Sequence, residues 1–162
     1  MKFEDVAPTQ GDAGNSFDWL WDIAADVTAT TPEWLNVPDI TGLTPNATPK
    51  LKDGTTYAHK GSTSQSKTGE DFTLSVQVKG VRDSQGEFQP ELLALIEAAD
   101  SIGVANTVAY RYYHATSAAP AYQGTAAVNW PRVNTGNDDH EWFTFDLTGQ
   151  GDRKKITNPA LD

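Results

Sequence analysis

The sequence contains no cysteine, and this absence excludes two kinds of architecture. Without thiols the chain forms neither a disulfide framework nor a thiolate metal site, so its fold does not depend on an oxidising compartment. No stretch approaches the roughly 20 apolar residues of a membrane-spanning helix, and the chain does not open on an apolar signal segment. We therefore expect a soluble protein that is not secreted.

Positive charge is also scarce. Twelve lysine and arginine residues stand against 22 aspartate and glutamate residues, which gives a formal net charge of -10. A surface that binds nucleic acid tightly must neutralise phosphates with lysine and arginine, so this balance argues against one. Apolar residues make up 38% of the 162 residues, which is enough for the core of one domain.

Alternation of apolar and polar residues predicts β-strands along much of the chain. The clearest example is residues 72–79, where every second side chain from Phe72 to Val78 is apolar. Further strand patterns cover residues 18–23, 107–114, 121–130 and 141–147. The sequence therefore predicts a mainly β protein.

One helix is predicted, over residues 90–101. Pro90 and Glu91 suit the first turn of a helix, and Gly103 follows its end. The residues expected to pack on the sheet are Leu92, Leu95, Ile96 and Ala99.

Residues 53–71 are long and polar, and we interpret them as a loop that contacts other molecules. Loops beyond roughly 12–15 residues without secondary structure are uncommon, and are usually functional or disordered. Glycine, proline and polar residues predict a flexible N-terminal arm (1–16) and a C-terminal arm (149–162). Residues 17–148 remain as the folded domain.

The residues that could carry chemistry form no convincing set. The run Asp138–Glu141 is rich in potential metal ligands, but adjacent residues of a strand point to opposite faces. His59 and His114 have no matching nucleophile or pair of carboxylates. We expect no enzyme activity, no bound metal and no cofactor.

The tryptophans leave a second hypothesis open. Aromatic faces stack on sugars, so a row of exposed tryptophans would indicate a non-catalytic carbohydrate-binding β-sandwich module. The five candidates are Trp19, Trp21, Trp34, Trp130 and Trp142. Most of them fall at alternating positions among apolar residues, which is typical of a core.

The order of the elements resembles the major tail tube protein of long-tailed (siphovirus-like) bacteriophages, from about Trp19 to Pro159. The segments that carry the resemblance are Asp18–Ile23, Asp39–Pro45, Asp53–Gly61, the helix around Leu92–Ala99, Tyr110–Tyr113, Ala121–Val128, Trp142–Gly149 and Ile156–Pro159. Tail terminators and the tube proteins of bacterial contractile secretion systems share the resemblance at the level of the fold.

The resemblance implies a β-sandwich or incomplete barrel with one flanking α-helix and a long inter-subunit loop. It also implies a structural virion protein, assembled in the host cytoplasm, whose hexameric rings stack into the tail tube. The implied partners are other copies of the chain, tape measure and tail completion proteins, and DNA that transits the channel without specific binding. No membrane and no cofactor are implied.

Two sets of residues are expected to act in such an assembly. Inter-subunit and inter-ring contacts are assigned to the long loop, at Asp53, Thr56, Tyr57, His59, Lys60, Lys67, Glu70 and Asp71. The channel wall is assigned to Thr73, Ser75, Gln77 and Lys79, the polar face of the clearest strand. We expect the acidic balance of the chain to discourage DNA from adhering to this wall.

Overall fold

The computed structural model describes residues 11–118 and 120–161, which form mainly β-structure. The strands are β1 (Trp19–Ala24), β2 (Leu35–Asn36), β3 (Ile40–Asp53), β4 (Gln65–Lys79), β5 (Thr107–His114), β6 (Ala121–Val128), β7 (Arg132–Val133) and β8 (Trp142–Ile156). The described residues also form one α-helix, α1 (Pro90–Asp100), and the short 3-10 helices η2 (Ser16–Asp18), η3 (Tyr57–His59), η4 (Gly103–Asn106) and η5 (Pro159–Leu161). None of these helices is long and apolar enough to span a membrane.

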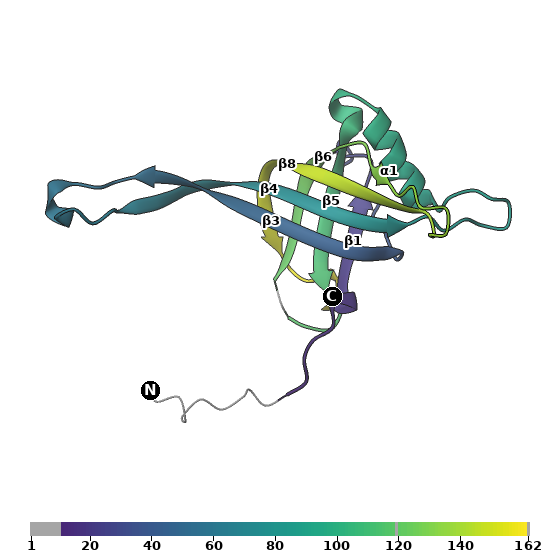
Figure 1. The fold of residues 1–162 in the computed structure, drawn as a ribbon, viewed down its shortest axis with the longest axis horizontal. Helices are drawn as coiled ribbons and strands as arrows, with labels where there is room; N and C mark the ends of the chain where they lie inside the picture. The colour runs from purple at the N-terminus through teal and green to yellow at the C-terminus, as the bar shows by residue number, and fades with distance from the viewer. Residues whose placement is uncertain (1–10, 119, 162) are drawn as a thin grey trace.

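All eight strands belong to one antiparallel sheet. The order of neighbours is β2-β1-β5-β6-β8-β4-β3, and β7 pairs with β8 outside this path. The first residues of β1 and β3 approach each other without pairing, and together they line a cavity of about 390 Å³ that includes Trp19 and Leu43. The sheet curves around the core but does not close (Figure 1). The predicted incomplete barrel with one flanking helix is confirmed.

The core lies between the inner face of the sheet and α1. Alternate residues of β4 are buried from Phe72 to Val78, as are Phe143, Phe145 and Leu147 on its neighbour β8. From the helix, Leu92, Leu95 and Ala98 are buried in the same cluster, while Ile96 and Ala99 are partly buried against it. Each large apolar side chain taken out of water contributes about 1.5–3 kcal/mol, so this cluster supplies most of the stability of the fold.

The helix has the boundaries that its sequence favours. Pro90 occupies its first turn, where a missing N–H leaves no bond unmade, and Glu91 lies beside the positive end of the helix. The helix ends at Asp100, and the backbone of Ser101 is already extended. The predicted range of residues 90–101 is therefore one residue too long.

The predicted loop over residues 53–71 is wrong in its extent. β3 ends at Asp53 and β4 begins at Gln65, so the connection spans only residues 54–64. The first part of β4 buries neither face, and no apolar alternation marks it as a strand. In β3, Pro45 and Pro49 obscure the pattern. An edge strand tolerates proline because its outer N–H groups have no partner in the sheet.

The predicted C-terminal arm over residues 149–162 is largely strand, since β8 continues to Ile156 and pairs with β6. Gly149 marks a close approach, because a Cβ there would lie 3.0 Å from the Phe72 carbonyl oxygen. Gly151 has a φ of 79°, a conformation that glycine adopts at no steric cost. These glycines bend a strand and do not end it. Of the predicted N-terminal arm, residues 1–10 lie outside the described part and residues 11–15 have no regular structure.

Candidate functional site

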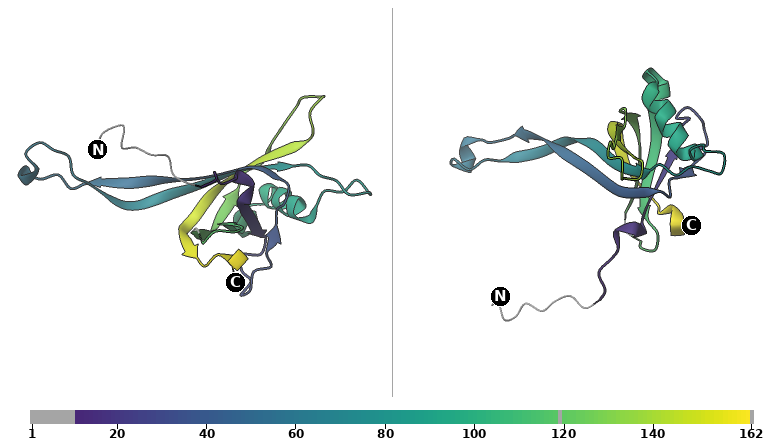
Figure 2. Two further views of the ribbon diagram at one scale, coloured as in Figure 1. Left: turned by 90° about the horizontal axis from the view of Figure 1, so that it is seen from below. Right: turned by 45° about the vertical axis from the view of Figure 1, so that its right-hand side comes forward.

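A two-stranded ribbon, which we call the arm (residues 47–72), projects far from the body of the molecule (Figure 1, Figure 2). β4 pairs with β8 only from Thr73 onward, and its outer part, Gln65–Phe72, pairs with β3 alone. At roughly 3.3 Å per residue, this outer part extends roughly 25 Å. An isolated two-stranded hairpin is only marginally stable in water, so the contacts at its tip and root matter.

Two ion pairs run across and along the arm. Lys50 Nζ lies 2.8 Å from Asp71 Oδ1, and Lys67 Nζ lies 2.5 Å from Glu70 Oε2. Exposed pairs of this kind contribute little to stability. The Lys50–Asp71 pair joins the two strands of the arm, whereas the Lys67–Glu70 pair lies within β4.

The connection at the tip is ordered by hydrogen bonds that begin at Asp53. Its Oδ1 accepts the N–H of Thr55 at 2.8 Å and the Thr55 hydroxyl at 2.5 Å. The hydroxyl oxygen of Thr55 in turn accepts the N–H of Ser64 at 3.0 Å. These bonds from Thr55 hold the pKa of the Asp53 carboxyl below its usual value. The carboxylate is therefore charged at neutral pH and fixes the start of the turn.

The turn presents Tyr57 to solvent. The Thr56 N–H donates to Nδ1 of His59 at 3.0 Å, and the chain then reverses through Lys60 and Gly61, which both have positive φ. The side chain of Tyr57 is fully exposed at the tip. Burial of an aromatic side chain is strongly favourable, so an ordered turn that displays one is suited to contact with another molecule.

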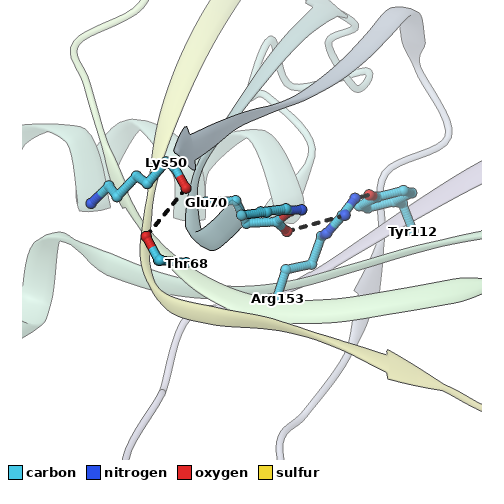
Figure 3. Close-up of polar contacts among 6 residues, drawn as sticks. Lys50, Thr68, Glu70, Tyr112 and Arg153 are labelled. Atoms are coloured by element: carbon cyan, nitrogen blue, oxygen red, sulfur yellow. Dashed lines mark hydrogen bonds and ion pairs between the residues drawn. The ribbon is translucent and has the colours of Figure 1, made fainter. Parts of the chain in front are cut away.

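Arg153 of β8 connects the arm to the body at the point where β4 and β8 separate (Figure 3). Its Nη1 donates to the Tyr112 hydroxyl at 2.8 Å, and its Nη2 lies 3.3 Å from Glu70 Oε1. The guanidinium carbon also lies 4.2 Å from the ring centroid of Tyr122 and 5.2 Å from that of Phe72. A planar guanidinium suits such combined stacking and hydrogen bonding. Arg153 thereby links β5, β6 and β8 to the root of the arm.

The groups around Arg153 hold fixed protonation states at neutral pH. Burial raises the pKa of the Tyr112 hydroxyl, so this group stays protonated. The hydrogen bond from Lys67 lowers the pKa of the Glu70 carboxyl, so this group stays charged. A charged carboxylate at the root of the arm and a half-buried guanidinium on the body therefore form a stable attachment.

The outer face of the sheet is a second candidate surface, which we call the polar face. Strand register places Thr44, Ser75 and Asp146 in one row, and Asn46, Thr73 and Thr148 in the next. Its members on β3, β4 and β8 are Thr44, Asn46, Thr73, Ser75, Gln77, Lys79, Thr144, Asp146 and Thr148. Hydroxyl and amide groups dominate it.

Charge on the polar face is low. Asp146 is paired with Arg132 of β7, and the hydrogen bond from Arg132 lowers the pKa of the Asp146 carboxyl. Lys79 lies at the end of β4 and is exposed. The acidity of the chain is therefore located mainly elsewhere.

The residues assigned to the inter-subunit loop lie along the arm from its tip to its root. Asp53 ends β3, the residues from Thr56 to Lys60 form the tip, and Lys67, Glu70 and Asp71 belong to β4. Thr73, Ser75, Gln77 and Lys79 lie together on the polar face. The structure thus separates the predicted residues into one projecting element and one sheet surface.

The sequence did not predict a role for Arg153, because this residue lies in the segment predicted as the C-terminal arm. Its partners are Glu70, Phe72, Tyr112 and Tyr122, which come from three other strands. No spacing along the chain connects these positions. Only the antiparallel order of β4, β8, β6 and β5 brings them together.

A buried carboxylate on β1, Asp22, has its hydrogen-bond partners within the body. Asp22 accepts hydrogen bonds from Arg111 Nε at 2.7 Å, the Tyr113 hydroxyl at 3.0 Å and Asn36 Nδ2 at 2.8 Å. The Arg111 guanidinium also covers the ring of Trp34 at 4.5 Å. These hydrogen bonds to Asp22 hold β1, β2 and β5 together.

The tryptophans do not form one sugar-binding row. Trp21 is in the core, Trp34 stacks on Arg111, and Trp130 is exposed beyond β6. In the part of the chain that the structure describes, no three histidine, aspartate or glutamate side chains gather as a metal site.

No protein-family model matches the sequence, and no curated protein matches it. Solved structures do match the fold. The SPP1 tail tube, determined by solid-state NMR and cryo-EM, superposes with a TM-score of 0.69 at 12% identity, over 91% of this chain and 81% of the SPP1 chain.

Two further assemblies contain similar chains. One is the tail of an empty GTA particle with C6 symmetry, with a TM-score of 0.62 at 11% identity, over 90% of this chain and all of that chain. The other is the sixfold-symmetrised baseplate of the anti-feeding prophage, with a TM-score of 0.60 at 11% identity, over 91% and 97% of the two chains. At these identities the likeness shows the fold, so the chain has the fold of subunits found in tail tubes and related tail structures.

Proposed function

We propose that this chain is a structural subunit of a phage-type tail tube, in which hexameric rings stack into a conduit for DNA. The observation that carries the proposal is the fold shared with the SPP1 tail tube over 91% of the chain. The sixfold symmetry of the GTA tail and of the anti-feeding prophage baseplate supports rings of six. In this proposal the protein is a virion component without enzyme activity, assembled in the host cytoplasm.

The polar face is the proposed channel wall. Sheets from six subunits would contribute more strands than the roughly 16–18 that already leave an aqueous channel. Duplex DNA carries one charge per about 1.7 Å, so a wall with many unpaired cations would retain it strongly. The wall proposed here consists mainly of threonine, serine, asparagine and glutamine side chains. In this proposal DNA passes because the channel wall is nearly neutral, and not because the wall repels it.

The arm is the proposed contact between subunits and rings. Its side chains are exposed over most of its length, its tip is ordered, and the root is attached to the body through Arg153. The other proposed partners are a tape measure protein inside the bore and tail completion proteins at the ends of the tube.

Electron microscopy of the purified protein across a concentration series, with light scattering on the same samples, tests the proposal. We expect hollow tubes or stacked rings above a threshold concentration, and end views with sixfold symmetry. Particles that remain monomeric at all concentrations, both alone and with preformed tail-tip complexes as initiators, would contradict it.

A further inference from the structure

The outer part of the arm, residues 50–67, carries charge opposite to that of the rest of the chain. Residues 50–67 contain four lysines and one aspartate, a net charge of +3. Since the whole chain has a net charge of -10, the remaining residues have a net charge of -13. Lys50 and Lys67 are paired within the arm. Lys52 and Lys60 have no ion-pair partner among the described residues, and they lie on either side of Tyr57 in the sequence. The tip therefore presents an exposed aromatic ring with two free cations.

The C-terminal end of α1 has the opposite character. Its last turn contains Glu97 and Asp100 and no basic residue. Both carboxylates are exposed, and neither has an ion-pair partner in the described part of the chain. The C-terminus of a helix carries a partial negative charge, so carboxylates there destabilise it and a cation would stabilise it. Within one copy, the two carboxylates therefore destabilise the end of α1, and no basic residue of its last turn offsets them.

An exposed apolar surface lies beside this helix end. Ile102 is 94% exposed, Val104 66% and Trp130 59%. Asn106 joins the segments that carry them, because its Nδ2 donates to the carbonyl oxygens of Ala98 in α1 and Val128 in β6, each at 2.8 Å. We call Ile102, Val104 and Trp130 the helix-end patch.

We propose that the arm tip of one copy docks on the helix end of a second copy. Tyr57 would pack on the helix-end patch, while Lys52 and Lys60 would face Glu97 and Asp100. This inference rests on the proposed tube function and names the surface that receives the arm. We take the partner to be a second copy because the chain itself carries both surfaces. The charge of the arm tip is opposite to that of the helix end, and the exposed Tyr57 ring can pack on the exposed apolar side chains of the helix-end patch.

The two surfaces cannot meet within one copy. The arm extends away from the body as a continuation of β3 and β4, and α1 lies at the opposite end of the body (Figure 1, Figure 2). A contact between different surfaces of identical subunits is head-to-tail, and such contacts close into rings or continue as helical filaments. Both outcomes are consistent with a stacked tube.

Exchange of the charges tests the pairing. We expect the double variant Lys52→Glu/Lys60→Glu and the double variant Glu97→Lys/Asp100→Lys each to raise the concentration needed for tube formation at least tenfold. An equimolar mixture of the two should assemble again, because each acidic arm then meets a basic helix end and each basic arm an acidic one. Assembly of either variant alone at the wild-type concentration would overturn the proposal.

Thermal melting of the same variants separates docking from damage to the fold. Glu97→Lys/Asp100→Lys removes the unfavourable charges at the helix end, so its Tm as a dilute monomer should rise by about 2–4 °C while assembly weakens. Loss of assembly together with a lowered Tm would indicate a folding defect and would contradict the account.

Cysteine cross-linking tests the contact independently of tube formation, and the chain has no native cysteine. Ala58→Cys at the tip and Ala105→Cys beside the patch are both exposed positions. A mixture of these two variants should form a disulfide-linked heterodimer on oxidation. Ala58→Cys mixed with Ala118→Cys, exposed beyond β5, is the matched control and should not.

The outcomes distinguish the two proposals. If the wild-type protein forms tubes but the Ala58–Ala105 pair does not cross-link above the control, the docking inference is wrong and the tube function stands. If this pair cross-links but the wild-type protein never forms rings or tubes, the docking contact stands and the tube function fails.

Discussion

The body and the arm of this molecule are held together by different forces. The body buries a continuous apolar cluster between its sheet and α1. The arm buries almost nothing, and short-range hydrogen bonds and exposed ion pairs order it. Because exposed polar contacts contribute little to folding, the stability of the monomer does not explain why the chain maintains a long ordered ribbon. The comparison supports the proposal that the arm joins subunits, while the body folds the subunit.

The largest expected effect comes from damage to the body. Leu95 is completely buried in α1, whereas Leu93 of the same helix is 42% exposed. Removing a buried leucine costs about 2–5 kcal/mol, and an unpaired charge adds to this. Leu95→Asp should therefore abolish cooperative thermal unfolding near the wild-type Tm, and Leu93→Asp should leave it nearly unchanged. A soluble Leu95→Asp variant that melts like the wild type would mean that the helix is not part of the monomer core.

The next effect concerns the arm and should leave the body intact. Pro49 and Glu70 pair across the ribbon, so residues 50–69 can be replaced by Asn-Gly, which favours a two-residue hairpin turn. We expect a monomer whose Tm changes by only a few degrees and which forms no tubes in electron micrographs. Tubes at the wild-type threshold concentration would show that the arm is dispensable for assembly.

A smaller effect is expected at the attachment between the two regions. Arg153→Met keeps a long side chain but removes the hydrogen bonds to Tyr112 and Glu70. Both bonds involve a charged partner, so the Tm should fall moderately. Hydrogen exchange should speed up in residues 65–72 more than in the core of β5.

The neighbouring exposed residue supplies the control for this change. Lys154→Met alters the adjacent exposed position of the same strand, which makes no ion pair with the arm among the described residues, and it should change neither quantity. Equal effects of the two substitutions would argue against a specific role of Arg153.

The smallest effect is the response of the tip to pH. The hydrogen bonds from Thr55 lower the pKa of Asp53 in the folded state. Their contribution to the stability of the tip is therefore fully present above the ordinary carboxyl pKa of about 4. It is lost as the pH falls through the lower pKa of the folded state. An NMR titration of the Thr55 amide should be flat from pH 8 to 5 and show a midpoint below 4. Asp53→Asn should abolish the transition, and a wild-type midpoint above 4 would contradict the proposed cap.

The sequence predicted the body better than the arm for a physical reason. Residues 72–79 and 90–100 each bury one face, so their apolar positions repeat with the period of a strand or a helix. Residues 47–53 and 65–71 bury neither face, so their apolar residues show no period. Periodicity alone therefore does not distinguish this paired ribbon from a loop. Glycines 149 and 151 predict the start of a C-terminal arm by composition, but in the structure they mark a close approach and a bend within β8.

The candidate site was predictable only in part. The exposed residues of the arm and the polar side of β4 follow from composition and alternation. The attachment of Arg153 to Glu70 and Tyr112 depends on strand order, and the helix-end patch depends on which apolar residues remain uncovered after folding. Neither can be derived from local patterns.

A helical cryo-EM reconstruction of the assembled wild-type protein would show directly which surface lines the bore and what each arm contacts. We expect a tube with a sixfold axis, a bore lined by Thr73, Ser75 and Thr148, and every arm in contact with another subunit. A filament whose bore is lined by other surfaces, or whose arms extend freely into solvent, would contradict the proposal.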